Sequence, residues 1–241
     1  MIFKVINKMN FKQFKNYLSQ SKKESDPLFS KKFYRPLSLF LGWILYRYGF
    51  TANSISFLSI LLGLISCLCY VSGNYTFSLL GSILILFIGI TDCIDGNIAR
   101  ASNQLSLRGD WLDAISGYLL AAFSPISVGI YAFQNYSPFY IEGDWILLGA
   151  FMSINNILTR LTYQKFSNLI LSKSSSKSLL IDKNGPSLSL SSEIGLVGWM
   201  APFLIFCTFL NNLNLYMFFY TSFYTLSLIY VIFLLYKRLI D

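Results

Sequence analysis

The sequence predicts an all-α integral membrane protein with six transmembrane helices and an N-terminal interfacial amphipathic helix. Two observations carry this prediction. Of the 241 residues, 54% are hydrophobic and only 12% are charged, whereas soluble domains are about 25% charged. The chain also contains six apolar segments separated by polar connections, and a span needs about 20 apolar residues. This composition excludes a disordered chain, a disulfide scaffold and an ordinary soluble enzyme.

We expect two regions along the chain. Residues 1–34 form a basic N-terminal arm, cytoplasmic or interfacial, and residues 35–241 form one six-span membrane domain. Lysines recur in the arm at positions 4, 8, 12 and 15, which is helical spacing. A basic amphipathic helix on an anionic membrane surface and a solvated basic tail both account for this pattern. The segment 36–46 is apolar but too short to span, so we expect it to lie in the interface.

The six apolar segments are the expected spans. They cover residues 54–70, 75–99, 110–133, 144–163, 195–210 and 215–236. The fifth is short and contains Pro202. We expect a kink there, because proline lacks a backbone donor and its ring crowds the preceding turn.

Basic residues alternate between the connections. The connections after the first, third and fifth segments carry no Lys or Arg, and the third carries Glu142 and Asp144 instead. By the positive-inside rule, both termini and the other connections are then cytoplasmic. The net charge of +8 is therefore a signal of topology and membrane attraction. We expect an integral membrane protein (of the inner or plasma membrane in a bacterium) that does not bind nucleic acid.

The chain contains no histidine and four cysteines. The first fact excludes a Ser-His-Asp triad and any histidine-ligated metal. No two cysteines have the CxxC spacing of zinc or redox sites, so we expect neither. Chemistry must therefore use carboxylates, Lys, Arg, Tyr or hydroxyl side chains.

Four carboxylates lie near the cytoplasmic ends of the second and third segments: Asp92, Asp95, Asp110 and Asp113. Ionised carboxylates beside hydrocarbon are costly and need a partner or a function. At about 100° per residue, the acids of each helix share one face. A tight connection makes the two helices antiparallel neighbours, so the acidic faces can meet. Hard divalent cations would offset their repulsion.

Other residues on these faces suit a phosphate ligand. Gly96, Ala99 and Gly109 leave space near the backbone, and Arg100 can present a planar guanidinium to a phosphate. One cation, or two about 4 Å apart, would polarise a phosphoryl group. The structural alternative is an acid–arginine network that only holds two helices together.

This stretch resembles the signature of the CDP-alcohol phosphotransferase (CDP-alcohol phosphatidyltransferase) family. DxxDGxxAR covers residues 92–100, and Gly109 and Asp113 follow at the spacing of that signature. Upstream, TANSISFLSILLG resembles the opening of the family's first span. The resemblance covers about residues 35–125 and implies six spans, cytoplasmic termini and a homodimer.

The resemblance also implies an activity in phospholipid or cell-envelope glycan synthesis. Such an enzyme transfers a substituted phosphate from a CDP-linked donor, either a CDP-alcohol or CDP-diacylglycerol, and releases CMP. The acceptor is an alcohol, borne by a lipid, a polyol or a glycan. Mg²⁺ or Mn²⁺, as two ions, would be held by Asp92, Asp95 and Asp113. The nucleotide pocket would be lined by Gly96, Ala99, Arg100 and Gly109.

One position departs from the signature. Its final Asp, which in the family is thought to activate the acceptor hydroxyl, is Gly117 here. We expect Asp113 and Asp110 to be the catalytic residues. The alternatives are a tyrosine base, an acceptor that is already ionised such as a phosphate, and a catalytically impaired protein that binds a CDP-linked ligand or a partner.

Two further classes of membrane protein use intramembrane carboxylates. An intramembrane prenyltransferase has more spans and a second, distant acidic motif, and a transporter with a carboxylate relay would carry an inverted repeat that this sequence lacks. Arg160, near the cytoplasmic end of the fourth segment, is either an acceptor-phosphate ligand or a topology anchor that reaches the interface. The Ser-rich stretch 167–192 is expected to be a cytoplasmic connection.

Overall fold

The computed structural model describes residues 9–19, 27–102, 106–173 and 195–240. Within these ranges the chain is helical and contains no β-strand. In chain order the helices are α1 (Phe11–Ser19), η1 (Ser30–Tyr34), α2 (Arg35–Arg47), α3 (Ala52–Val71), α4 (Tyr75–Ala101), α5 (Leu107–Asn135), α6 (Asp144–Lys173), η3 (Leu196–Met200), α8 (Ala201–Phe209) and α9 (Leu213–Ile240).

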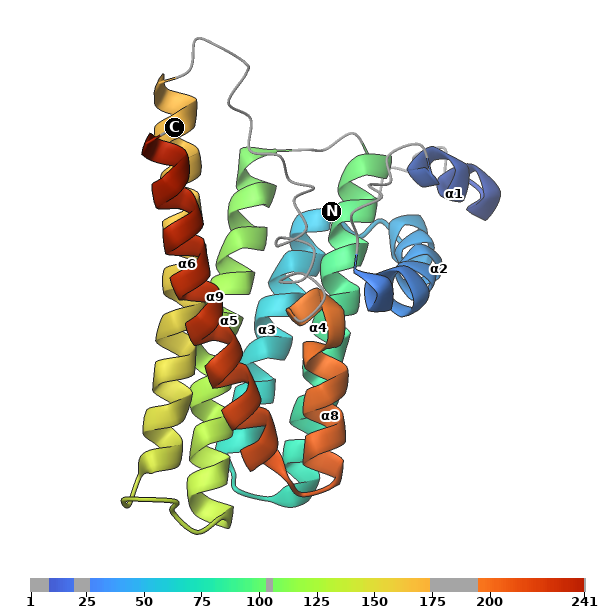
Figure 1. Cartoon of the computed structure of the whole chain (residues 1–241). Helices are drawn as coiled ribbons and strands as arrows, with labels where there is room; N and C mark the ends of the chain where they lie inside the picture. The colour runs from blue at the N-terminus through green and yellow to red at the C-terminus, as the bar shows by residue number, and fades with distance from the viewer. Residues whose placement is uncertain (1–8, 20–26, 103–105, 174–194, 241) are drawn as a thin grey trace.

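Six helices run lengthwise beside one another in a bundle, and α1 and α2 lie outside it against α4 (Figure 1). In α1, Phe14 and Leu18 are buried whereas Lys12 and Lys15 are exposed. The indole nitrogen of Trp43 on α2 donates a hydrogen bond to the carbonyl of Met9, 3.1 Å away. Of the four lysines at helical spacing, those at positions 4 and 8 lie outside the described residues, as does most of the Ser-rich stretch.

Four of the described helices are long and apolar enough to cross a membrane, namely α3, α4, α5 and α9. The apolar stretch Gly198–Phe209 is shorter. Helix α6 runs the length of the bundle (Figure 1) and packs against both α5 and α9, but Asn155, Asn156 and Arg160 lower its hydropathy. The sequence predicted six spans, and by length and composition the structure supports four.

The expected break in the fifth apolar segment is present. Gly198, inside η3, has non-helical backbone angles (φ −101°, ψ −125°), and Pro202 lies in the first turn of α8. A proline ring clashes with the carbonyl four residues before it. That residue is Gly198, so the proline accounts for the position of the kink.

Helix α3 lies between α4 and α5 and packs closely against both (Figure 1). The sequence predicted that α4 and α5 would be direct neighbours, and along most of their length they are not, because both pack against α3 and α5 packs also against α6. The reason is the composition of α3, whose buried positions are mostly small: Ser56, Ser59, Gly63 and Ser66. Small residues allow two other helices to approach one backbone.

Glycines bring α5 and α6 into backbone contact. A Cβ at Gly149 would lie 2.5 Å from the carbonyl oxygen of Pro125, and one at Gly129 would lie 2.6 Å from the carbonyl oxygen of Trp145. Backbone atoms cannot move aside as a flexible side chain can. The position of α6 relative to α5, and with it the position of Arg160, therefore depends on these two glycines.

Replacing Gly149 with alanine should destabilise the bundle, because the new methyl group would overlap the backbone at Pro125. We expect the free energy of unfolding in detergent to fall by about 1–3 kcal/mol. Gly63→Ala is the matched control, since its Cβ would meet only the side chains of Leu120 and Ile88, at 3.7 and 3.8 Å. Equal stabilities of the two variants would contradict this account of the α5–α6 contact.

Candidate active site

Two carboxylates meet near one end of the bundle. The side chain of Asp92, toward the end of α4, is in hydrogen-bonding contact with the side chain of Asp113, near the start of α5. Asp92 is half-buried and Asp113 is exposed. Two carboxylates in contact repel each other unless a proton or a cation lies between them. The fold therefore concentrates negative charge at this pair.

A third carboxylate lies one turn along α4. Asp95 is buried, and its Oδ2 accepts a hydrogen bond of 2.8 Å from the hydroxyl of Ser56 on α3. A second bond between the same helices joins the hydroxyls of Ser59 and Thr91, 2.7 Å apart. These two bonds fix the rotation of α4 on α3, so the acidic face of α4 is turned toward α5.

Arg100 lies along the same face of α4. Its Nη2 donates a hydrogen bond to Asn97, 3.2 Å away, and the Asn97 amide donates one to Ser38 on α2, also 3.2 Å away. A Cβ at Gly96 would lie 3.2 Å from the same Nη2. The space left by Gly96 is therefore occupied by the Arg100 guanidinium. Ala99, the residue before Arg100, is half-buried.

The start of α5 carries the remaining predicted residues. Ser106 caps the helix by accepting a hydrogen bond of 3.1 Å from the backbone of Gly109. A Cβ at Gly109 would lie 3.3 Å from the side chain of Asn53 on α3, so the glycine permits a close approach of the two helices. Asp110 is exposed in the first turn, and its charge acts on Asp113.

Gly117 lies one turn after Asp113 on α5. An ideal Cβ at this position would be 3.2 Å from Nη1 of Arg160, which belongs to α6. The charge of Arg160 acts on Asp113, and that of Arg35, at the start of α2, acts on Asp92. Two arginines from different helices thus offset the carboxylate pair.

Tyr34, in η1, packs against this part of α4. Its ring fills the space beside Gly89, where a Cβ would lie 2.8 Å from the ring. Burial, followed by the nearby Cys93 and Asp92, raises the pKa of Tyr34 well above its ordinary value. The hydroxyl therefore stays protonated, and within the described part of the chain it is buried without a hydrogen-bond partner.

The chemical types of the side chains at this site suit a divalent cation. Among the described residues no group of three or more His, Cys, Asp or Glu side chains is close enough to form a metal cage. The donors that do meet are the oxygens of Asp92 and Asp113, with Asp95 one turn away. Carboxylate oxygens are the ligands that Mg²⁺ and Mn²⁺ prefer, and Mg²⁺ commonly takes only one or two of them.

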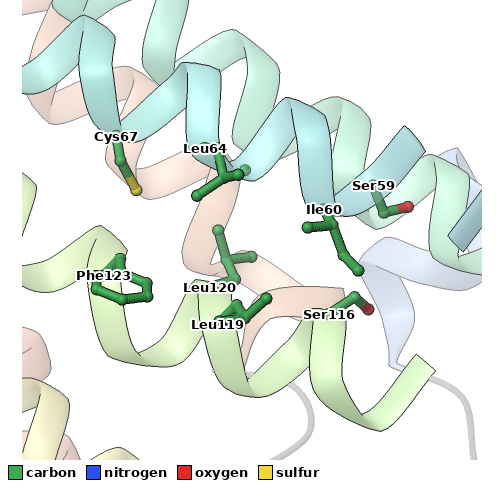
Figure 2. A pocket seen from close by; sticks show the side chains of 9 residues that line it. Ser59, Ile60, Leu64, Cys67, Ser116, Leu119, Leu120 and Phe123 are labelled. Carbon is green, nitrogen blue, oxygen red and sulfur yellow. The ribbon is translucent and has the colours of Figure 1, made fainter. Parts of the chain in front are cut away.

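An apolar groove begins beside these acids and runs between α3 and α5. Figure 2 shows its lining, with Ser59 and Ser116 at one end and Cys67 and Phe123 at the other. Ser116 donates a hydrogen bond of 2.8 Å to the carbonyl of Asp113. Leucines and Ile60 line the middle of the groove. One end of the groove is therefore polar and lies one turn along α5 from Asp113, whereas the rest is hydrophobic.

Comparison with known families decides which class of protein this site belongs to. The model of the CDP-alcohol phosphatidyltransferase family matches residues 50–175, slightly more than half of the chain. The chain belongs to this family. No curated protein matches the chain in a sequence comparison. Membership confirms the resemblance found in the motif, and the family is one of transferases that act on CDP-alcohols.

The matched region of this CDP-alcohol phosphatidyltransferase family member contains every predicted site residue. Sequence reasoning missed Ser56, which bonds to Asp95, and Tyr34, which packs against the same part of α4. A signal for Ser56 does exist, because small buried residues recur along α3 at spacings of three and four: Ser56, Ser59, Gly63 and Ser66. Tyr34 has no comparable signal, since the residues it packs against lie on another helix, α4. Asn156 lies four residues before Arg160 on the same helix, a spacing that can be read from the sequence.

Ser56→Ala should cost more stability than Ser59→Ala. Ser56 donates to a buried carboxylate, and hydrogen bonds to charged groups contribute about 1.5–3 kcal/mol. Ser59 bonds to a neutral hydroxyl, for which about 0.5–1.5 kcal/mol is usual. Unfolding in detergent, followed for both variants, measures the difference. If Ser59→Ala proved the more damaging, Asp95 would not depend on Ser56 as described.

Proposed function

We propose that the protein transfers a substituted phosphate from a CDP-linked donor to an alcohol-type acceptor at this site and releases CMP. The observation that carries the proposal is the contact between Asp92 and Asp113, which brings the two halves of the family motif together. The family match over residues 50–175 supports the class of donor.

Asp92, Asp95 and Asp113 would hold one or two divalent cations, Mg²⁺ or Mn²⁺. When bound, such an ion polarises the phosphoryl group and offsets its charge. Arg100 would donate hydrogen bonds to the diphosphate, and Gly96, Ala99 and Gly109 would line the nucleotide side of the pocket. Ser56 keeps Asp95 in place through its 2.8 Å hydrogen bond.

The transfer forms a P–O bond between the acceptor oxygen and the phosphorus that carries the alcohol. It breaks the P–O bond to CMP, which leaves with the electron pair. Asp113 and Asp110 are our candidates to accept the hydroxyl proton, because they lie one turn apart at the start of α5. Breaking a diphosphate requires above all positioning and offset of charge, and the acids and arginines of this end provide both.

The apolar groove between α3 and α5 would take the hydrocarbon of a lipid substrate (Figure 2). Its lining is mostly aliphatic, and its Ser116 end adjoins Asp113. A donor such as CDP-diacylglycerol, or a lipid acceptor, would then place its head group at the acids and its chain in the bilayer. This arrangement suits phospholipid or cell-envelope glycan synthesis.

The topology proposed from charge places this end of the bundle in the cytoplasm. Arg100 lies in the last turn of α4 and Arg108 in the first turn of α5, whereas Glu142 lies in the connection between α5 and α6. We include α6 and the η3–α8 segment as the fourth and fifth of six spans, since both lie lengthwise in the bundle (Figure 1). Cytoplasmic termini agree with this arrangement. A homodimer is proposed from the family resemblance alone.

A second candidate function is favoured by one residue. Gly117 stands where the family motif ends in Asp, so a protein that binds CDP-linked ligands without turnover is the alternative. Binding and turnover must therefore be measured separately.

Purified full-length protein should bind CDP in the presence of Mg²⁺ and release CMP from CDP-diacylglycerol or CDP-glycerol. Asp92→Asn and Asp113→Asn should each weaken metal-dependent CDP binding by about 100-fold or more, since even outer-shell partners of metal ligands contribute 10–100-fold. Glu142→Gln, at the opposite end of the bundle, is the matched control and should bind as the wild type does.

The outcomes separate the two functions. CDP binding with CMP release supports the transferase, and CDP binding without CMP release from any donor supports the binding protein. Wild-type protein that binds no CDP with Mg²⁺ or Mn²⁺ would overturn both. Release from CDP-diacylglycerol but not from CDP-glycerol would assign the apolar groove to the donor.

A further inference from the structure

A cationic side chain lies beside position 117 in this chain, although the family motif places a carboxylate at that position. Gly117 has no side chain, and Nη1 of Arg160 lies 3.2 Å from the place where its Cβ would be. An aspartate side chain would begin at that Cβ and extend toward the guanidinium. The glycine therefore lets an arginine from α6 approach the turn of α5 that follows Asp113.

Arg160 is held in this position by the fold. Its Nε donates a hydrogen bond of 3.1 Å to the side chain of Asn156, which is buried one turn earlier on α6. The neighbouring Asn155 bonds to Thr225 on α9 at 2.8 Å, and Tyr118 on α5 bonds to Gln164 at 2.8 Å. These contacts hold α6 against both α5 and α9. The direction of the guanidinium is therefore set by the fold and by Asn156.

The guanidinium retains unused hydrogen-bonding capacity. An arginine has five N–H donors, and the bond to Asn156 uses only the one on Nε. Among the described residues, the terminal nitrogens of Arg160 donate no hydrogen bond and form no ion pair with a carboxylate, although the charge acts on nearby Asp113. A half-buried arginine whose role was to join α5 to α6 would direct these donors at protein oxygens.

We propose that Gly117 and Arg160 form an acceptor subsite that binds the phosphate monoester of a phosphorylated alcohol. A planar guanidinium binds phosphate oxygens through paired hydrogen bonds, and here four N–H donors stand beside the reactive carboxylates. A neutral alcohol offers no charge to this arginine. The inference rests on the proposed transferase function and adds the chemical class of the acceptor.

The subsite can be tested without turnover. Glycerol 3-phosphate is the probe, and glycerol is its uncharged counterpart. In EDTA, at constant ionic strength, glycerol 3-phosphate should raise the unfolding midpoint of the wild-type protein and glycerol should not. Without divalent cations no metal ion can bind the phosphate of the probe, and the carboxylate pair repels it. Any binding that is measured therefore depends on Arg160.

Arg160→Gln should weaken glycerol 3-phosphate binding by about 10- to 100-fold, as expected for hydrogen bonds to a charged group. Lys165→Gln, which removes an exposed cation from the same helix, is the matched control and should bind as the wild type does. Gly117→Asp should also abolish binding, because its carboxylate would pair with the guanidinium. CDP binding with Mg²⁺ should persist in Lys165→Gln, and the unfolding transitions of the other two variants show whether they fold.

Three results would overturn the subsite. The first is wild-type protein that binds CDP but not glycerol 3-phosphate. The second is an Arg160→Gln variant that binds the probe normally, and if that variant does not fold, normal binding by Gly117→Asp is equally decisive. The third is faster CMP release with glycerol than with glycerol 3-phosphate. A wild-type protein that does not bind CDP would instead contradict the proposed function, and the subsite with it.

Discussion

The packing of two helices on the small face of α3 is the constraint on which the site depends. Serines and a glycine let α4 and α5 approach α3 closely, and hydroxyl bonds from Ser56 and Ser59 set the rotation of α4. Because α3 separates the two acidic helices over most of their length, Asp92 and Asp113 meet only near one end. The carboxylates are thereby concentrated near one end of the apolar bundle, where the nucleotide of the proposed donor would meet them.

Charge compensation explains the other polar residues at this end. Carboxylates at membrane depth are expensive unless they are paired, and Arg35 and Arg160 approach the acidic pair from opposite elements, α2 and α6. Arg100 is held against Gly96 by Asn97. The arginines are therefore distributed around the acids and leave an all-oxygen set of side chains at the centre, as a hard cation requires.

The departure at position 117 acquires a physical meaning from this arrangement. Losing a carboxylate from the motif removes a base, yet the space is not left to solvent, because Arg160 lies beside it. The close α5–α6 contact at Gly129 and Gly149 makes this approach possible. The glycine at position 117 and the position of α6 thus together determine the charge that the proposed acceptor would meet.

The sequence by itself determined the helical membrane class, the kink before Pro202 and the motif that identifies the family. It also placed the segment boundaries to within a few residues, except at the end of α6, which extends ten residues beyond the predicted residue 163. These properties follow from local hydropathy, proline sterics and fixed spacing along one helix. Only the tertiary structure decided that α3 lies between α4 and α5, that Ser56 holds Asp95, and that Arg160 lies beside Gly117. Periodicity specifies which face of a helix is polar, but the partner of that face depends on how small residues allow separate helices to pack.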